Sequence, residues 1–192
     1  QGANMETQVY AFAKIDDEGA RNVVYKEIKC GKSRFGMWDQ GGDLREHPYG
    51  KNNFLKRIKK GDWIVHVNSP SYGKCVVVQA IGEYDYDEGI ECGWGKDFNT
   101  FIPVDIDTII EFDRNDPNVL PSVNLSPMRR GQRILKVDDF LQSLDNIKAG
   151  AFSEDSQNLR GVVHLREKIE NELLPQISEL IHQMNRSKNL ER

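Results

Sequence analysis

The chain has 192 residues, of which 38% are hydrophobic and 29% are charged, and its formal net charge at pH 7 is −4. These values are typical of a soluble globular protein, and no run of about 18 apolar residues is available for a transmembrane helix. The first residues form no apolar leader, so we expect a cytoplasmic protein. Residues 1–4, ahead of Met5, are interpreted as an expression remnant.

Charge is divided unevenly along the chain. Residues 26–74 contain 11 Lys and Arg against five Asp and Glu, whereas residues 83–116 contain 11 acidic residues against two basic ones. Such a division suits the steering of a polyanion to one face of a protein. An uneven but merely solvated surface is the alternative.

Strands are predicted where apolar residues alternate or run together between turn residues. The predicted strands cover residues 8–15, 22–30, 62–68, 74–87 (with a bend at Gly82) and 100–112. A short helix is predicted over 52–58, ended by Gly61, and a strand or turn followed by a helix over 129–144. The glycine-rich segments 31–53 and 88–99 are predicted to be irregular loops.

These elements predict an α+β fold, in which a small curved β-sheet or barrel is flanked by short helices. A doubly wound α/β fold is disfavoured because strands and helices do not alternate repeatedly. The domain is expected over residues 5–150, and residues 151–192 are expected to be a linker and an amphipathic helical tail, divided at Pro175. The tail could pack back on the domain, pair with a second copy or lead to a further domain.

The three cysteines, Cys30, Cys75 and Cys92, have no CxxC spacing, and the four histidines are scattered. Reduced thiols are therefore expected, with neither a metal site nor a cofactor. Cys75 begins the apolar run CVVV and is predicted to lie in the core.

The three tryptophans occupy two kinds of sequence. Trp63 lies among β-branched residues of a predicted strand, so we expect it in the core. Trp38 and Trp94 lie in glycine-rich loops, GMW and GWG, where another planar group can approach closely. Two such rings that meet could sandwich a nucleobase. The alternative is that each ring closes one end of the sheet.

The order of these motifs resembles the PUA-like superfamily, and in particular its YTH and EVE domains, from about Val9 to Leu144. The motifs are GMW at 36–38, the helix and strand NFLKRIKKGDWIV at 53–65, the Val-Asn turn at 67–68, the loop Trp94 and the strand TFIPVDI at 100–106. The resemblance implies a non-enzymatic module that takes a flipped or single-stranded base into an aromatic cage and detects a methyl group on it.

Carried over position by position, the resemblance implies three groups of site residues. The cage would use Trp38 and Trp94, with Tyr84, Tyr86 and Phe98 competing as the third apolar member. The base edge or its turn would use Asp39, Asn52, Asn68, Ser69 and Asn99. The phosphates would be bound by Lys32, Arg34, Lys51, Arg57, Arg129, Arg130 and Arg133, of which Arg34 is the best candidate. The choice between N6-methyladenine and a 5-modified cytosine, and between DNA and RNA, stays open.

Domains of this kind commonly serve as specificity parts of modification-dependent restriction or defence systems. The resemblance therefore implies a nuclease or NTPase partner, or a homodimer through the tail. No membrane partner is expected.

Two other functions compete with this interpretation. A PUA-like nuclease or RNA-processing protein would need a carboxylate cluster, for which Asp85, Asp87, Glu88 and Glu91 are available without a defined ligand spacing. A protein-interaction module would use the tail helix instead.

Overall fold

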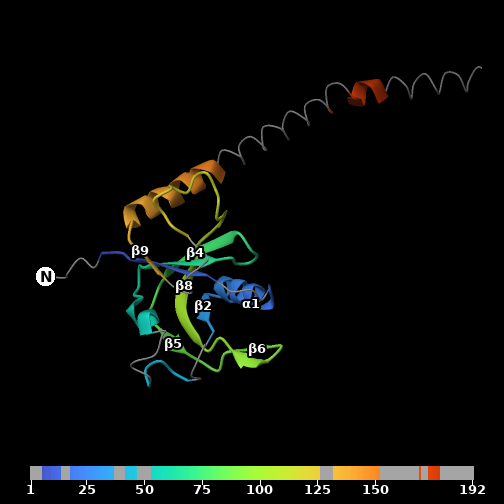
Figure 1. The fold of residues 1–192 in the computed structure, drawn as a ribbon. Helices are drawn as coiled ribbons and strands as arrows, with labels where there is room; N and C mark the ends of the chain where they lie inside the picture. Colours follow the sequence, from blue (N-terminus) through green and yellow to red (C-terminus); the bar gives the residue numbers. More distant parts are fainter. Residues whose placement is uncertain are drawn as a thin grey trace, which may run out of the picture. The chain divides into compact units, whose positions relative to one another are not determined.

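A computed structural model describes residues 6–13, 18–36, 42–46, 53–125 and 132–151, together with residue 169 and residues 173–177. The chain forms two compact units, residues 1–147 and residues 148–192. The first unit is an α+β domain built on a curled, half-barrel sheet, shown in Figure 1.

The strands of the first unit follow one another around one main sheet and one small hairpin. They are β1 Val9–Ala13, β2 Lys32–Phe35, β3 Trp63–Val67, β4 Lys74–Ala80, β5 Asp85–Tyr86, β6 Ile90–Cys92, β7 Gly95–Asp97, β8 Thr100–Asp113 and β9 Gln132–Ile134. The helices are α1 Glu18–Lys29, the 3-10 helix η1 Asn53–Arg57 and a helix over 137–151.

The main sheet has the strand order β2-β8-β4-β3-β1-β9, and β5 also pairs with β8. β1 and β3 are parallel, with Val9 opposite Trp63, and the other pairs of this sheet are antiparallel. The 14 residues of β8 make it the longest strand, and it pairs with β2, β4 and β5.

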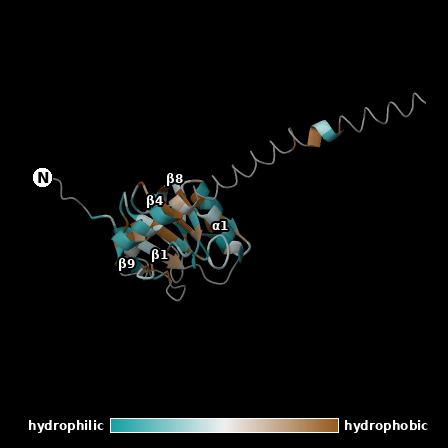
Figure 2. Cartoon of the chain, turned by 90° about the horizontal axis from the view of Figure 1, so that it is seen from above, coloured by the Kyte–Doolittle hydropathy of each residue, from teal (hydrophilic) through white to brown (hydrophobic). Residues whose placement is uncertain are grey.

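Both faces of the central strands are buried. On one face, Val24 and Ile28 of α1 pack with Ile64 and Val78. On the other face, Phe140 and further apolar residues of the helix over 137–151 pack with neighbouring strand residues. Figure 2 shows the hydrophobic strands in the interior of the unit. Two buried faces explain why residues 75–78 form an unbroken apolar run rather than an alternating one. Cys75 is fully buried, as expected.

Three predictions of local structure are wrong. Residues 22–29 of the predicted strand over 22–30 belong to α1, where Ala20, Val24 and Ile28 repeat every four residues and are buried. The predicted loop over 31–53 contains the strand β2. The sequence did not predict this strand, because its buried residues include the polar Ser33 and Arg34 and so give no apolar pattern. The predicted loop over 88–99 contains the hairpin β6-β7.

The remaining strands lie where the sequence predicts them, except that the segment 74–87 breaks at Ile81–Tyr84 between β4 and β5. Gly82 at this break packs against the ring of Pro103. Trp63, expected in the core, is half-buried and packs against the apolar cluster that contains Phe140. In the second unit, Ile169, Leu173, Leu174 and Ile177 are exposed. Among the described helices, none is long and apolar enough to cross a membrane.

Candidate functional site

Four segments meet at the first residues of β8. Phe35, the last residue of β2, pairs with Thr100, the first residue of β8, and its carbonyl accepts a hydrogen bond of 2.8 Å from the Thr100 hydroxyl. Tyr86 of β5 also pairs with Thr100. The hairpin β6-β7 ends at Asp97, just before β8, and Figure 1 shows β5 and β6 at this end of the sheet. This site is called the hairpin end of β8 below.

Trp94 is the exposed aromatic ring of the hairpin end. It occupies the turn between β6 and β7, where 57% of its surface is exposed. Its indole Nε1 donates a hydrogen bond of 3.2 Å to Oδ2 of Asp97, and Oδ1 of Asp97 accepts a bond of 2.6 Å from the Phe98 amide. The indole is therefore tethered at its polar edge while more than half of the residue's surface stays exposed.

Phe98 lies beneath the hairpin rather than beside Trp94. Its ring is 3% exposed, and the residue adopts a positive φ of 57°. A Cβ built on Gly36 would lie 3.4 Å from this ring and 3.8 Å from Oδ1 of Asp97. The prediction of Phe98 as an open cage wall is corrected by this burial: its ring forms the floor on which the end of β2 and the hairpin meet.

Gly36 is the described residue nearest in sequence to Trp38. The chain therefore leaves β2 next to Phe98 and Asp97. Asp97 follows Trp94 by three residues in the sequence. Trp38, Asp39, Lys51, Asn52, Arg129 and Arg130 lie outside the described residues.

Arg34 is buried, and its guanidinium is used inside the protein. It forms ion pairs with Glu27 of α1 and with Asp87, at 2.7 Å for the latter, and Nη1 also donates to the Phe98 carbonyl at 2.8 Å. Only 3% of the residue is exposed. The prediction of Arg34 as the best phosphate ligand is therefore wrong, because its donors already hold α1, Asp87 and the base of the hairpin together.

Asp87 is the acceptor at the centre of this arrangement. It takes two hydrogen bonds from Arg34, one of 2.8 Å from Lys32 and one of 2.8 Å from the Gly89 amide. The bonds from Arg34 hold the pKa of Asp87 well below its ordinary value, although partial burial acts in the opposite direction. Lys32, another predicted phosphate ligand, is thereby paired as well.

Tyr84 joins the segment 42–46 to the sheet. Its hydroxyl donates to Oδ1 of Asp43 at 3.2 Å and accepts a bond of 3.0 Å from the Leu44 amide. Burial raises the pKa of Tyr84 to about 12. The residue packs against the apolar cluster that contains Val24 and Ile28 of α1. Tyr84 and Tyr86 are half-buried, so Trp94 offers the most open ring of the described cage candidates.

Asn68 and Ser69 lie at the other end of the sheet. They belong to the β3-β4 turn, which precedes β4, whereas Trp94 follows β4. Asn68 is buried with a φ of 61°, and its side-chain oxygen accepts the Gly73 amide; Ser69 donates to the Arg21 carbonyl. They form the predicted Val-Asn turn, and the structure places this turn at the opposite end of β4 from Trp94. This separation could have been predicted from the order of the strands, because residues just before and just after β4 lie at its opposite ends.

Asn99 is the base-edge candidate that the structure does place near the hairpin. Its amide nitrogen donates to the Asp87 carbonyl at 3.3 Å, and its own carbonyl accepts the Asp87 amide. Asn99 therefore closes the base of the hairpin. No pattern in the sequence indicated that Asp87 would accept hydrogen bonds from several segments here.

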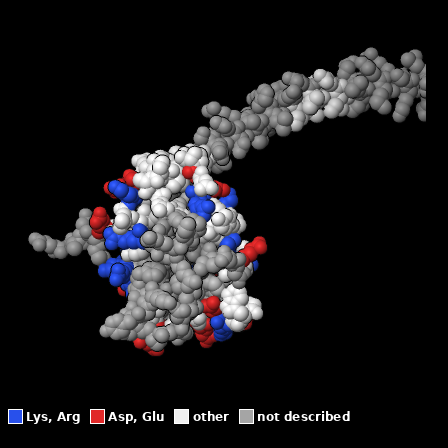
Figure 3. Space-filling view, in the orientation of Figure 1, with Lys and Arg blue, Asp and Glu red and all other residues white. Residues whose placement is uncertain are grey.

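Arg57 and Arg133, the other described phosphate candidates, are exposed; Arg57 lies on η1, and Arg133 lies on β9 at the edge of the main sheet. Burial raises the pKa of Tyr10, and the positive charges of Arg133 and Arg57 act in the opposite direction. Tyr10 pairs with Arg133 across β1 and β9. Figure 3 shows Lys and Arg on the side of η1 and β9, whereas Asp and Glu predominate at the hairpin end.

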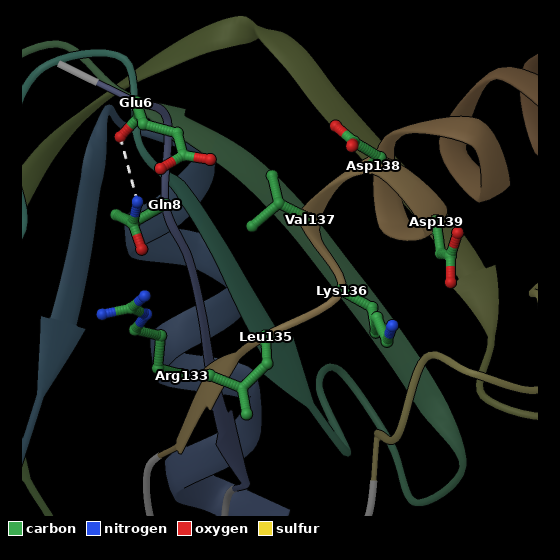
Figure 4. A pocket seen from close by; sticks show the side chains of 8 residues that line it. All are labelled: Glu6, Gln8, Arg133, Leu135, Lys136, Val137, Asp138 and Asp139. Carbon is green, nitrogen blue, oxygen red and sulfur yellow. Dashed lines mark hydrogen bonds between the residues drawn. The ribbon is translucent and has the colours of Figure 1, made fainter.

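An open cleft of about 330 Å³ lies between the N-terminal segment and the start of the helix over 137–151 (Figure 4). Its lining residues are Glu6, Gln8, Arg133, Leu135, Lys136, Val137, Asp138 and Asp139. Three carboxylates outnumber two cations, and the lining contains no aromatic ring. This cleft is suited neither to stacking a base nor to concentrating phosphate.

The acidic residues of the hairpin end are mostly paired. Asp87 is bound to Arg34 and Lys32, and Glu88 is bound to Lys96 at 2.7 Å. Within the described parts of the chain, no group of three or more His, Cys, Asp or Glu is arranged to hold a metal ion. The carboxylates that a nuclease would need are thus dispersed among ion pairs in this region.

Comparisons of the chain with protein-family models, curated proteins and solved structures return no match.

Proposed function

We propose that the chain is a non-enzymatic nucleic-acid-binding module of the PUA-like YTH/EVE kind, which recognises a modified, methylated base at the hairpin end of β8. The observation that carries the proposal is the open, tethered ring of Trp94. The path of β2 supports it, because Gly36 leads toward the second loop tryptophan from a position against Phe98 and Asp97.

The physical basis of the proposal is stacking on a prepared surface. A base that stacks on an aromatic side chain gains about 1–3 kcal/mol, and a ring already fixed by a hydrogen bond loses little freedom on binding. The buried floor of Phe98 and the Arg34–Asp87 pair hold the hairpin that carries the ring.

A carboxylate in the hairpin favours bases with an exocyclic amino group. Glu91 lies on β6 in the hairpin that carries Trp94, and carboxylates accept hydrogen bonds. Adenine, cytosine and guanine carry exocyclic amino donors, whereas thymine and uracil do not. This agrees with either N6-methyladenine or a modified cytosine. A role in a restriction or defence system, with a nuclease or NTPase partner or a second copy of the chain, stays a prediction.

The test is the substitution Trp94→Ala, assayed by fluorescence anisotropy with short single-stranded oligonucleotides that are unmodified or carry N6-methyladenine or 5-methylcytosine. We expect the wild type to prefer one modified strand and the variant to lose that preference by about tenfold or more. Because Trp94 is exposed, its removal should change the free energy of unfolding by less than about 0.5 kcal/mol.

Leu135→Ala is the matched control, since it truncates another exposed apolar side chain, 79% exposed, at the cleft beside β9. It should keep the preference. Equal binding of all strands by the wild type, or an unchanged preference in Trp94→Ala, would refute base recognition at this site.

A further inference from the structure

Two arginine side chains flank an exposed tyrosine at the end of β8 opposite the hairpin. Tyr72, in the β3-β4 turn, is 65% exposed. The guanidinium carbon of Arg21, on α1, lies 5.8 Å from the centre of its ring, and that of Arg114, just after β8, lies 5.5 Å from it. We call Arg21, Tyr72 and Arg114 the turn-end cluster.

The two guanidinium groups are not neutralised within the described protein. Neither forms a salt bridge with a described carboxylate, and the buried Nε of Arg21 and Nη1 of Arg114 have no hydrogen-bond partner among the described residues. A guanidinium carries five N–H donors and keeps its charge at all ordinary pH values. Arg34 differs, since carboxylates and a carbonyl take its donors.

The backbone around the cluster is held in place. The Arg21 carbonyl accepts the Ser69 hydroxyl, and the Arg114 amide donates to the Gly73 carbonyl at 2.7 Å. The adjacent carboxylate, Asp113, is occupied by Lys74 at 3.1 Å and by the Asn115 amide. The cluster therefore presents two cations whose positions are set by α1 and β8, and the neighbouring acid is bound elsewhere.

We propose that the turn-end cluster binds phosphate groups of a nucleic-acid backbone. Arginine recognises phosphate through paired, planar N–H donors, and phosphate contacts position a strand without reading its sequence. The anion chemistry stands on the cluster alone, whereas the nucleic-acid source of the phosphate rests on the proposed function.

The length of β8 sets the size of ligand required. Its 14 residues span at most roughly 45 Å, so the turn-end cluster and Trp94 are separated by up to about 13 nucleotide steps of a B-form strand. A strand of about 20 nucleotides would reach both.

The experiment uses the full chain, the variant Arg21→Gln/Arg114→Gln and the control Lys26→Gln/Lys60→Gln, which removes two exposed positive charges elsewhere. Binding of an unmodified single-stranded 20-mer is measured across a salt series. Two lost phosphate contacts should reduce the magnitude of the slope of log K against log salt by about 1.4. Affinity should fall at least fivefold, with little change in the control.

Inorganic phosphate, followed through the Nε–Hε NMR signals of arginine in the wild type, separates the sources of the anion. Shifts of Arg21 and Arg114 together with the expected loss of 20-mer affinity support the proposal. Shifts without that loss would show a site for free phosphate, and the absence of shifts would show no anion site; either result overturns the proposal. If the double variant does not fold, Arg114→Gln alone is used, with half the slope change expected.

The two proposals can fail separately. If Trp94→Ala leaves base preference unchanged but the arginine variant still weakens the 20-mer, the backbone contact stands without base recognition. If base preference depends on Trp94 and the arginine variant equals its control, only the turn-end proposal is overturned.

Discussion

The two ends of β8 use the same residue types in opposite ways. At the hairpin end, Arg34 is 3% exposed and bound to carboxylates, while Trp94 is 57% exposed. At the turn end, Arg21 and Arg114 lack carboxylate partners in the described structure and lie against the ring of Tyr72. The comparison teaches that an arginine near an aromatic residue is a ligand candidate only when its donors are not already satisfied.

The strongest way to break this comparison is to remove the arginine that we consider internal. Arg34→Met should lower the free energy of unfolding by about 3 kcal/mol, at the lower end of the range for breaking a buried ion pair, because Asp87 and Glu27 keep partial access to water. Urea denaturation measures the change. Arg114→Met is the matched control and should cost less than about 1 kcal/mol.

A stable Arg34→Met variant would show that the Arg34–Asp87 pair does not hold the hairpin end. A large loss in Arg114→Met would instead show that the turn-end arginine is structural, and the contrast between the two ends would disappear.

Acid should reduce the difference between wild type and Arg34→Met. The pKa of Asp87 is lowered in the folded wild type, so the unfolded chain binds more protons in acid and stability rises with pH. The contribution of Asp87 is therefore complete above its unfolded pKa of about 4 and is lost as the pH falls from there toward the folded pKa. Urea denaturation at pH 7 and at pH 3 should give a smaller difference at pH 3. An equal difference at both values would assign the effect of Arg34 to packing.

A smaller effect is expected from the glycines of the hairpin. Gly89 has a φ of +77°, and a Cβ there would meet the Asp97 carbonyl and the side chain of Asn99. Gly89→Ala should cost about 2 kcal/mol and weaken base preference, because the hairpin must shift. Gly93→Ala is the control, since its Cβ would meet nothing within 4 Å, and it should cost less than about 0.5 kcal/mol.

Thermal unfolding and the anisotropy assay measure both alanine variants. Equal stability of the two would contradict the path of the hairpin over Asp97 and Asn99.

The fold could be predicted from the sequence where burial is apolar and regular. β1, β3, β4 and β8 follow alternating or continuous apolar runs, and η1 precedes Gly61 as expected. The β-branched pair Val23–Val24 suggested a strand, but burial at Ala20, Val24 and Ile28 favours a helix against the sheet. β2 could not be recognised, because Ser33 and Arg34 are buried by polar partners that lie far along the chain.

The candidate site was predictable to a similar degree. The glycines around Trp94 indicated an accessible ring, and 57% of that ring is exposed. The pairing of Arg34 with Asp87 spans 53 positions, and no local pattern signals it. The turn-end cluster likewise combines a helix, a turn and a strand end, so its cations could be counted in the sequence but not placed together.

The parallel pairing of β1 with β3 bears on how the chain folds. Val9 lies opposite Trp63, so the two strands can join only after α1, β2 and η1 have been looped out between them. Closing such a loop costs entropy before any contact repays it, so parallel pairing of this kind slows folding. A ribosome-bound chain that ends before β3 would contain β1 and α1 without the strand that joins β1 to the sheet. Its apolar residues would stay exposed and would be binding sites for chaperones.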